Sequence, residues 1–127
     1  MMKRVTGFGG IFFKSTNPTQ LAAWYKTHLG LDVADWGGVV FRWAEDGSTD
    51  GTTTWCPFAA DTQYFAPSSA SFMLNFRVEN LQALLAVLRQ EGVHVLENTE
   101  SSEFGEFGWI IDPDGNKIEL WQPPSGC

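Results

Sequence analysis

Two segments of the chain carry apolar side chains at helical spacing. In the first, apolar residues between Leu21 and Leu29 recur every three or four positions, with Asn17 before them and Gly30 after them. Asparagine is a common helix N-cap, and glycine is the usual residue at a left-handed helix end. The same order of cap, apolar stripe and stop recurs between Asn80 and Gly92. The pattern therefore predicts two amphipathic helices at matching places in two halves of the chain.

Short segments rich in β-branched and aromatic residues surround these helices, and such segments are typical of strands. The predicted strands cover residues 8–14, 31–36, 38–43 and 52–58 in the first half, and 72–78, 93–97, 107–112 and 116–122 in the second. Each half then has the order strand, helix and three strands, and the segment APSSAS, residues 66–71, joins the halves. This weak internal repeat predicts an α+β fold of two tandem βαβββ modules, near residues 5–65 and 71–123, within a single domain of residues 1–127.

Composition narrows the possible partners. The chain has 127 residues, 43% of them hydrophobic, and a net charge of −7, which excludes a nucleic-acid partner because such partners need a basic surface. No apolar run is long enough to cross a bilayer, and the two cysteines lack the spacing of a disulfide framework, so we expect a reduced, cytoplasmic protein. Six Trp and ten Phe exceed what one small core would hide. We therefore expect aromatic side chains in a cleft and at the interface of a homodimer.

Three quoted segments carry a resemblance to a known superfamily. They are LAAWYKTHLGLDV after the first strand, MLNFRVENLQALLAVL at the start of the second half, and DPDGNKIELW near the end. With two βαβββ modules, the chain resembles the vicinal oxygen chelate superfamily, which includes glyoxalase I, bleomycin-resistance proteins and extradiol dioxygenases. The resemblance implies a curled mixed sheet around a cleft that holds a divalent metal or a small molecule. It also implies that Glu119, in the last strand, points into this cleft and, in metal-dependent relatives, would bind the metal.

Strand alternation agrees with that placement of Glu119. Lys117, Glu119 and Trp121 share one face of the strand, while Ile118 and Leu120 share the other and suit packing under a helix. The alternative is a carboxylate on a solvent-facing surface. We favour the cleft because Trp121 beside it is poorly suited to open water.

The other ligands of a metal site are missing from the positions that the resemblance implies. Gly10 and Met73 occupy two of these positions, and residues 51–60 contain no His, Asp or Glu. A divalent transition metal needs three or four converging nitrogen, oxygen or thiolate ligands. We therefore expect no metal cofactor, with a divalent metal bound at Glu119 as the alternative.

The predicted cleft is mostly apolar with a few polar groups. Alternation places Phe12 and Lys14 on the ligand face of the first strand, and Met73, Asn75 and Arg77 on that of the strand at 72–78. Trp55 is a further candidate for the wall, although its facing is not fixed by the pattern. The alternative role for Arg77 is a buried ion pair with Glu119 that only holds the modules together. The predicted ligand-binding residues are Phe12, Lys14, Trp55, Met73, Asn75, Arg77, Glu119 and Trp121.

Three functions remain open at this point. The first is a metal-free small-molecule-binding protein of the bleomycin-resistance kind, and the acidic charge of the chain would suit a cationic ligand. The second is a glyoxalase-like lyase or isomerase, or a dioxygenase, in which Glu119 is the best candidate for a catalytic base or metal ligand. The third is a structural or partner-binding role. We favour the first because the residues at the implied metal positions other than Glu119 lack metal-ligating side chains.

Overall fold

The computed structural model describes residues 8, 10–47 and 50–125. Its two helices, α1 (Pro18–Leu29) and α2 (Leu81–Gln90), lie where the spacing predicted them. The side chains of Asn17 and Asn80 accept hydrogen bonds from the backbone N–H groups of Gln20 and Ala83, as expected of N-caps. Both predicted helices and both predicted caps are therefore confirmed.

A five-stranded mixed sheet occupies the second half of the chain. Its strands are β1 (Leu74–Arg77), β2 (His94–Val95), β3 (Glu100–Ser102), β4 (Gly105–Ile111) and β5 (Lys117–Gln122). The order is β1-β5-β4-β2, and β3 pairs with the other end of β4. β1 runs parallel to β5, whereas the other pairs are antiparallel. The mixed α+β class is confirmed, and β3 is a strand that the pattern did not predict.

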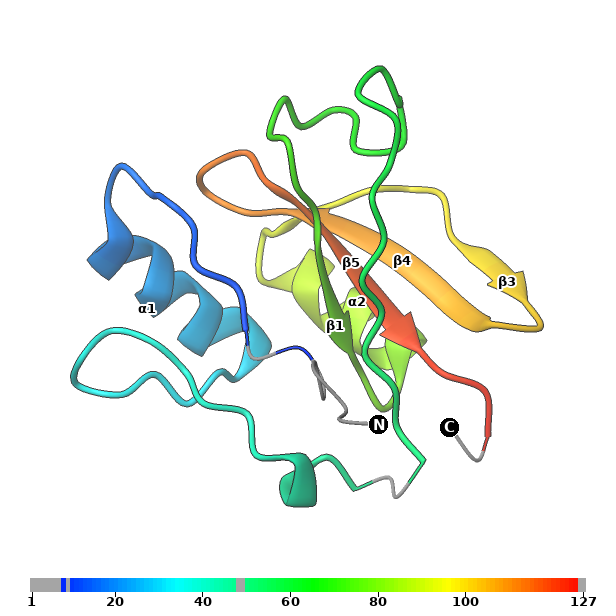
Figure 1. Cartoon of the computed structure of the whole chain (residues 1–127), viewed down its shortest axis with the longest axis horizontal. Coiled ribbons are helices and arrows are strands. Elements are labelled where there is room, and N and C mark those ends of the chain that lie inside the picture. The colour runs from blue at the N-terminus through cyan, green and yellow to red at the C-terminus, as the bar shows by residue number, and fades with distance from the viewer. Residues whose placement is uncertain (1–7, 9, 48–49, 126–127) are drawn as a thin grey trace, which may run out of the picture.

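The main core lies between the sheet and the two helices. In Figure 1, α2 lies behind the sheet and α1 lies to one side of β1. Ile118 and Leu120 of β5 are completely buried, as alternation predicted. β4 approaches α2 closely at Gly108, where an added Cβ atom would come within 2.9 Å of the Leu85 side chain. The buried core residues are Leu21, Tyr25, Leu74, Leu81, Leu85, Leu88, Ile110, Ile118 and Leu120.

The strands predicted in the first half are not formed in the described residues. Residues 10–14, 31–36, 38–42 and 52–58 have no strand assignment, and the short 3-10 helix η1 (Trp43–Glu45) ends the third segment. Residues 34–38 instead form a turn, in which the Ala34 N–H donates to the Gly38 carbonyl at 2.9 Å. β propensity favours an extended chain but does not supply the hydrogen-bonded neighbour that a strand needs. The prediction of these strands was wrong there, and the arrangement of two tandem modules stays unconfirmed.

Within the described residues, neither helix combines the length and the apolarity needed to cross a bilayer.

Candidate ligand site around Glu119

The turn between β4 and β5 is organised by the carboxylate of Asp112. Its Oδ1 accepts the backbone N–H groups of Asp114 and Asn116, both at 2.9 Å. Its Oδ2 accepts the Asn116 side-chain amide at 2.9 Å and the hydroxyl of Tyr25, from α1, at 2.7 Å. Gly115 has φ +80°, a left-handed conformation that glycine adopts without strain. The motif DPDG therefore folds as a tightly bonded turn that α1 also contacts.

This turn sets the register that builds the candidate site. Trp109 lies opposite Glu119 across the β4–β5 ladder, and Asn75 of β1 lies on its other side. The next pairs bring Phe107 and Arg77 to Trp121 in the same way. These side chains share the side of the sheet that faces away from the core, which we call the Glu119 face. The Glu119 face comprises Asn75, Arg77, Phe107, Trp109, Lys117, Glu119 and Trp121.

Glu119 is buried, with 8% of its surface exposed, and neutral donors surround its carboxylate. Its Oε1 accepts the hydroxyl of Tyr64 at 2.7 Å and the indole N–H of Trp109 at 3.0 Å. Its Oε2 accepts the side-chain amide of Asn75 at 2.7 Å. A buried carboxylate is tolerated only when such hydrogen bonds replace the lost water. These three bonds fix the orientation of the carboxylate.

Lys117 places a buried ammonium group beside the same cluster. Its Nζ donates to the backbone carbonyl of Tyr64 at 2.6 Å and lies 5.1 Å from the ring centroids of both Tyr64 and Trp109. Burial lowers the pKa of Lys117, while the negative charge of Glu119 opposes that shift. Burial and the hydrogen bond to Glu119 raise the pKa of Tyr64, so its hydroxyl remains a donor at neutral pH.

Arg77 takes a different partner from the one considered in the sequence. Its Nε lies 3.1 Å from Asp46 Oδ2, and its guanidinium carbon lies 5.4 Å from the ring centroid of Trp121. Within the described residues the ion pair of Arg77 is with Asp46, whereas Glu119 is held by neutral donors. The alternative of a buried Arg77–Glu119 pair is therefore wrong. Arg77 joins the segment after η1 to the edge of the sheet.

The predicted site residues fall into two groups. Asn75, Arg77, Glu119 and Trp121 come together on the Glu119 face, and Met73 is half-buried just before β1. Phe12, Lys14 and Trp55 are exposed to solvent and make no hydrogen bond or ring contact with that face in the described residues. Gly10, the first implied metal position, is also exposed. The role of Phe12, Lys14 and Trp55 in ligand binding stays a prediction.

Two of the three residues that donate hydrogen bonds to Glu119, Trp109 and Tyr64, were not among the predicted site residues. Trp109 could have been found by counting back along the hairpin from the DPDG turn, which pairs it with Glu119. Tyr64 lies in a loop outside any helix or strand, and its hydroxyl reaches Glu119 from 55 positions away. No local pattern marks such a contact.

The side chains around Glu119 do not fit a divalent metal. The nearest groups are a phenol, an indole, an amide nitrogen and an ammonium, which are donors or a cation rather than metal ligands. No cluster of three or more His, Cys, Asp or Glu occurs in the described part of the chain. Glu119 would therefore have to hold a metal with almost no help from its neighbours.

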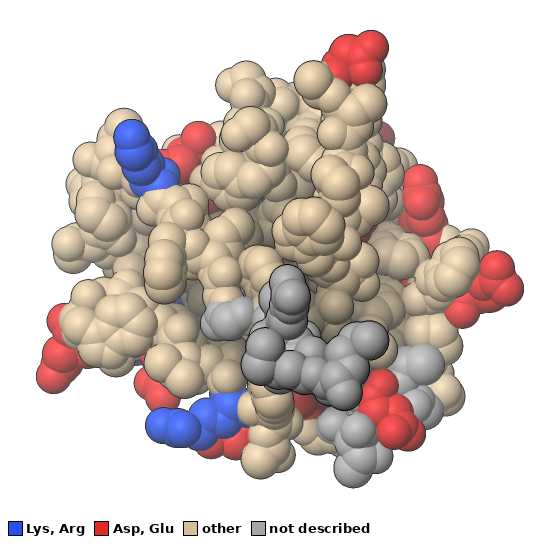
Figure 2. Space-filling model, viewed as in Figure 1, with Lys and Arg blue, Asp and Glu red and all other residues tan. Residues whose placement is uncertain are grey.

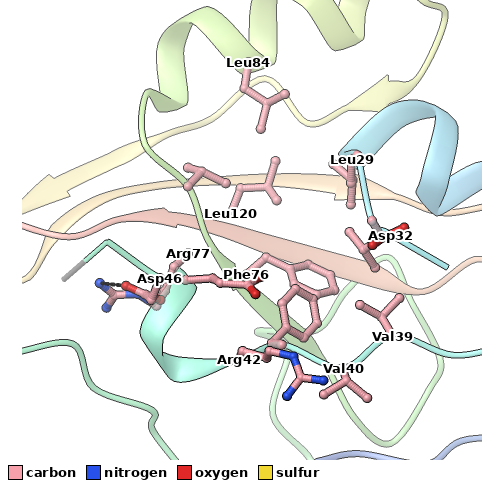
Figure 3. A pocket seen from close by; sticks show the side chains of 15 residues that line it. Leu29, Asp32, Val39, Val40, Arg42, Asp46, Phe76, Arg77, Leu84 and Leu120 are labelled. Carbon is pink, nitrogen blue, oxygen red and sulfur yellow. Dashed lines mark hydrogen bonds and ion pairs between the residues drawn. The ribbon is translucent and has the colours of Figure 1, made fainter. Parts of the chain in front are cut away.

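A separate hollow of about 330 Å³ lies on the other side of β1 and β5. Its floor includes Phe76, Leu84 and Leu120, which belong to the core side of the sheet. Figure 3 shows these side chains facing Val39 and Val40, with Arg42 and the Arg77–Asp46 pair at the rim. Because Leu120 and Glu119 alternate on β5, this hollow and the Glu119 face open on opposite sides of the sheet.

Comparison with solved structures supports the fold class. A protein of unknown function from Agrobacterium tumefaciens str. C58 superposes with a TM-score of 0.56 over 96% of this chain and 98% of that chain, at 18% identity. A structure from the mobile metagenome of V. Pseudocholerae superposes with a TM-score of 0.51 over 96% and 98%, at 16% identity. These low identities bear on the fold alone.

A protein-family profile identifies the family of this chain. The profile of the glyoxalase-like domain matches residues 10–121, which is most of the chain. The chain belongs to this glyoxalase-like family, as the resemblance implied.

One solved structure shows higher identity over a shorter stretch. TnmS3, an antibiotic binding protein from Streptomyces sp. CB03234, is 34% identical over 42% of this chain, with a TM-score of 0.39. This match spans 45% of the length of TnmS3. No functionally curated protein matches the chain significantly.

Proposed function

We propose that this protein binds a small organic molecule against the Glu119 face, and that it does so without a metal. The observation that carries the proposal is the shell around Glu119, in which three neutral donors hold a buried carboxylate. The resemblance implies that the equivalent residue binds the metal in metal-dependent relatives, but here its neighbours suit hydrogen bonding instead.

The composition of the Glu119 face supports this role. Small-molecule sites are mostly apolar, with a few oriented polar groups that set the position of the ligand. Trp121 and Phe107 supply an apolar wall, with their rings nearly parallel at a centroid distance of 6.3 Å. A carboxylate has about four acceptor positions, and the three bonds leave Oε2 of Glu119 able to accept one more. A ligand with an amine or hydroxyl donor and an apolar body fits this surface.

Charge does not single out a cationic ligand. On the face shown in Figure 2, carboxylates are scattered around the rim and do not gather in one patch. At the site itself, the ammonium of Lys117 lies beside Glu119 and offsets its charge. The acidic net charge is therefore explained as well by solubility as by attraction of a cation.

The enzyme alternative has less support. A lyase, isomerase or dioxygenase using Glu119 as base or metal ligand would need that carboxylate free to meet a substrate or an ion. Three of its four acceptor positions are already filled, which leaves room for one hydrogen bond from a ligand, and the neighbouring groups are donors rather than further metal ligands. We therefore place binding ahead of catalysis.

We also propose that the protein is a cytoplasmic homodimer. Large aromatic side chains are exposed in the first half of the chain, including Trp36, Phe41, Trp43 and Trp55. Extended exposed apolar surface commonly marks an interface, and a second copy would remove it from water.

The proposal is tested by metal content and ligand binding measured together. Elemental analysis of purified wild-type protein should find no stoichiometric Zn, Ni, Mn or Fe. A thermal-shift screen of amine- and hydroxyl-bearing aromatic compounds should yield ligands whose stabilisation is lost in Glu119→Gln. The exposed Glu103→Gln is the matched control and should bind as wild type does.

A metal ion bound at Glu119 would contradict the proposal. About one metal ion per chain in wild type, absent from Glu119→Gln and present in Glu103→Gln, would show that Glu119 is a metal ligand and restore the enzyme hypothesis. Ligands that stabilise wild type and Glu119→Gln equally would place binding elsewhere.

A further inference from the structure

Residues 58–66 contact the Glu119 face through Tyr64, and we call them the Tyr64 strap. In Figure 1 the ascending green stretch passes in front of β5, on the side of the sheet turned away from α2, and a loop at the top then leads into β1. In the described part of the chain, both hydrogen bonds between the strap and the sheet involve Tyr64. Its hydroxyl donates to Glu119 at 2.7 Å, and its carbonyl accepts from Lys117 at 2.6 Å.

The side chain of Tyr64 has the surroundings of a bound ligand. Its hydroxyl meets the best acceptor on the face, the carboxylate of Glu119. The ammonium of Lys117 lies 5.1 Å from its ring centroid, and the ring of Trp109 meets it edge to face at 6.1 Å. Each contact matches one feature of a phenol. Glu119 accepts from the hydroxyl, Lys117 lies near the electron-rich ring, and Trp109 packs against the ring at an edge-to-face angle.

Apart from Tyr64, the strap is held in place by local hydrogen bonds. Its remaining hydrogen bonds are short-range turns, such as the Ala66 N–H to the Gln63 carbonyl at 3.1 Å. Tyr64 is half-buried, and Phe58, which stacks on it at 5.5 Å, is 48% exposed. Residues 51–57, which precede the strap, are exposed to solvent. Segments with few buried contacts and exposed backbone open at low free-energy cost.

We propose that Tyr64 is a built-in, displaceable occupant of the ligand site, and that the ligand is a neutral aromatic molecule with a phenol-like hydroxyl. The ligand takes the place of the Tyr64 ring between Glu119, Lys117 and Trp109 while the strap lifts. This inference rests on the proposed function and narrows its ligand class. A cationic ligand is disfavoured because it would lie beside the ammonium of Lys117.

The test uses p-cresol, which reproduces the tyrosine side chain, with toluene as the probe that lacks the hydroxyl. Tyr64→Ala removes the ring but retains the carbonyl that accepts from Lys117. Because the apparent dissociation constant falls when the competing closed state is removed, Tyr64→Ala should bind p-cresol about tenfold or more tightly than wild type by calorimetry. It should prefer p-cresol to toluene, and adding Glu119→Gln should abolish that preference.

A milder variant and a strap control cover the case in which Tyr64→Ala does not fold. Tyr64→Phe keeps the ring and removes only the hydrogen bond to Glu119, so it should tighten p-cresol binding by roughly two- to fivefold. Phe65→Ala changes a neighbouring strap residue that has no hydrogen bond to Glu119, and it should bind p-cresol less tightly than Tyr64→Ala does.

The outcomes separate this inference from the proposed function. It is overturned if removing the Tyr64 ring or hydroxyl leaves p-cresol binding unchanged, or if toluene binds as well as p-cresol. If wild type nevertheless binds another ligand that needs Glu119, the proposed function stands without the displaceable tyrosine. If no compound binds any of these proteins in a Glu119-dependent way, the proposed function fails as well.

Discussion

Replacing Tyr25 with Phe removes one oxygen from the contact between α1 and the β4–β5 turn. The Tyr25 hydroxyl lies 2.7 Å from Asp112 Oδ2, and the two residues are 5% and 4% exposed. A hydrogen bond to a charged group contributes about 1.5–3 kcal/mol to stability. Asp112 keeps the donors from Asp114 and Asn116, so it is not left unsatisfied. We therefore expect a loss in the lower part of that range, about 1.5–2 kcal/mol.

Urea unfolding at pH 7.5, followed by tryptophan fluorescence, measures this loss directly. The midpoint should fall with an unchanged m value, and the melting temperature should fall by about 5–8 °C for a chain of this size. Tyr64→Phe is a useful comparison, since it removes a bond of the same length to Glu119 from a half-buried side chain. Its cost should be smaller, because water can reach the vacated position.

The pH dependence of the free energy of unfolding tests the same hydrogen bond in a second way. Burial, with the hydrogen bond to Asp112, raises the pKa of Tyr25 above its ordinary value of 10.0. The folded state then keeps this proton where the unfolded state loses it, so the contribution is complete below pH 10 and is lost as the pH rises further. The Tyr25→Phe protein has no phenolic proton at this position, so its stability does not show this decrease. The stability gap between the two proteins should therefore close by about 1.4 kcal/mol per pH unit above 10. A Tyr25→Phe protein within about 0.5 kcal/mol of wild type at pH 7.5 would refute the role given to the bond.

Two further predictions concern the site and the assembly. Trp109→Phe removes the indole donor to Glu119 from a side chain that is 1% exposed, and we expect it to cost about 1–3 kcal/mol in urea unfolding. The exposed Phe104→Leu is the control and should cost under about 0.5 kcal/mol. Sedimentation should show a dimer at roughly tens of micromolar, a range chosen for an interface of ordinary affinity. A monomer under those conditions would contradict the assignment of the exposed aromatic surface to a second copy.

The parts of the fold that could be predicted from the sequence are those fixed by neighbours along the chain. Asn17 and Asn80 cap their helices through donors three residues away, so a short segment contains all the information. The facing of Glu119 follows from alternation along β5, and its partner Trp109 follows from the register of a short turn. Such features depend on spacing alone.

The parts that could not be predicted depend on distant partners. Strand-like segments in the first half, such as residues 38–42, have the composition of strands but no paired strand in the described residues. Arg77 was considered as a partner for Glu119, yet its ion pair is with Asp46, 31 positions away. Tyr64 reaches the site from a loop. No periodicity specifies which loop residue will cover a given point of a sheet.

The turn at Asp112 links the stability of the fold to the chemistry of the site. Side chains alternate along β5, so a slip of one residue in the hairpin would turn Glu119 towards the core and Ile118 and Leu120 towards the strap. The bonds to Asp112, including the one from Tyr25, hold the register in which Glu119 meets Trp109. Glu119 is in turn tolerated in that buried position because Trp109, Asn75 and Tyr64 satisfy it. Of these three donors, only Tyr64 lies outside the sheet, so it is the one that can leave without disturbing the register and that a ligand hydroxyl can replace.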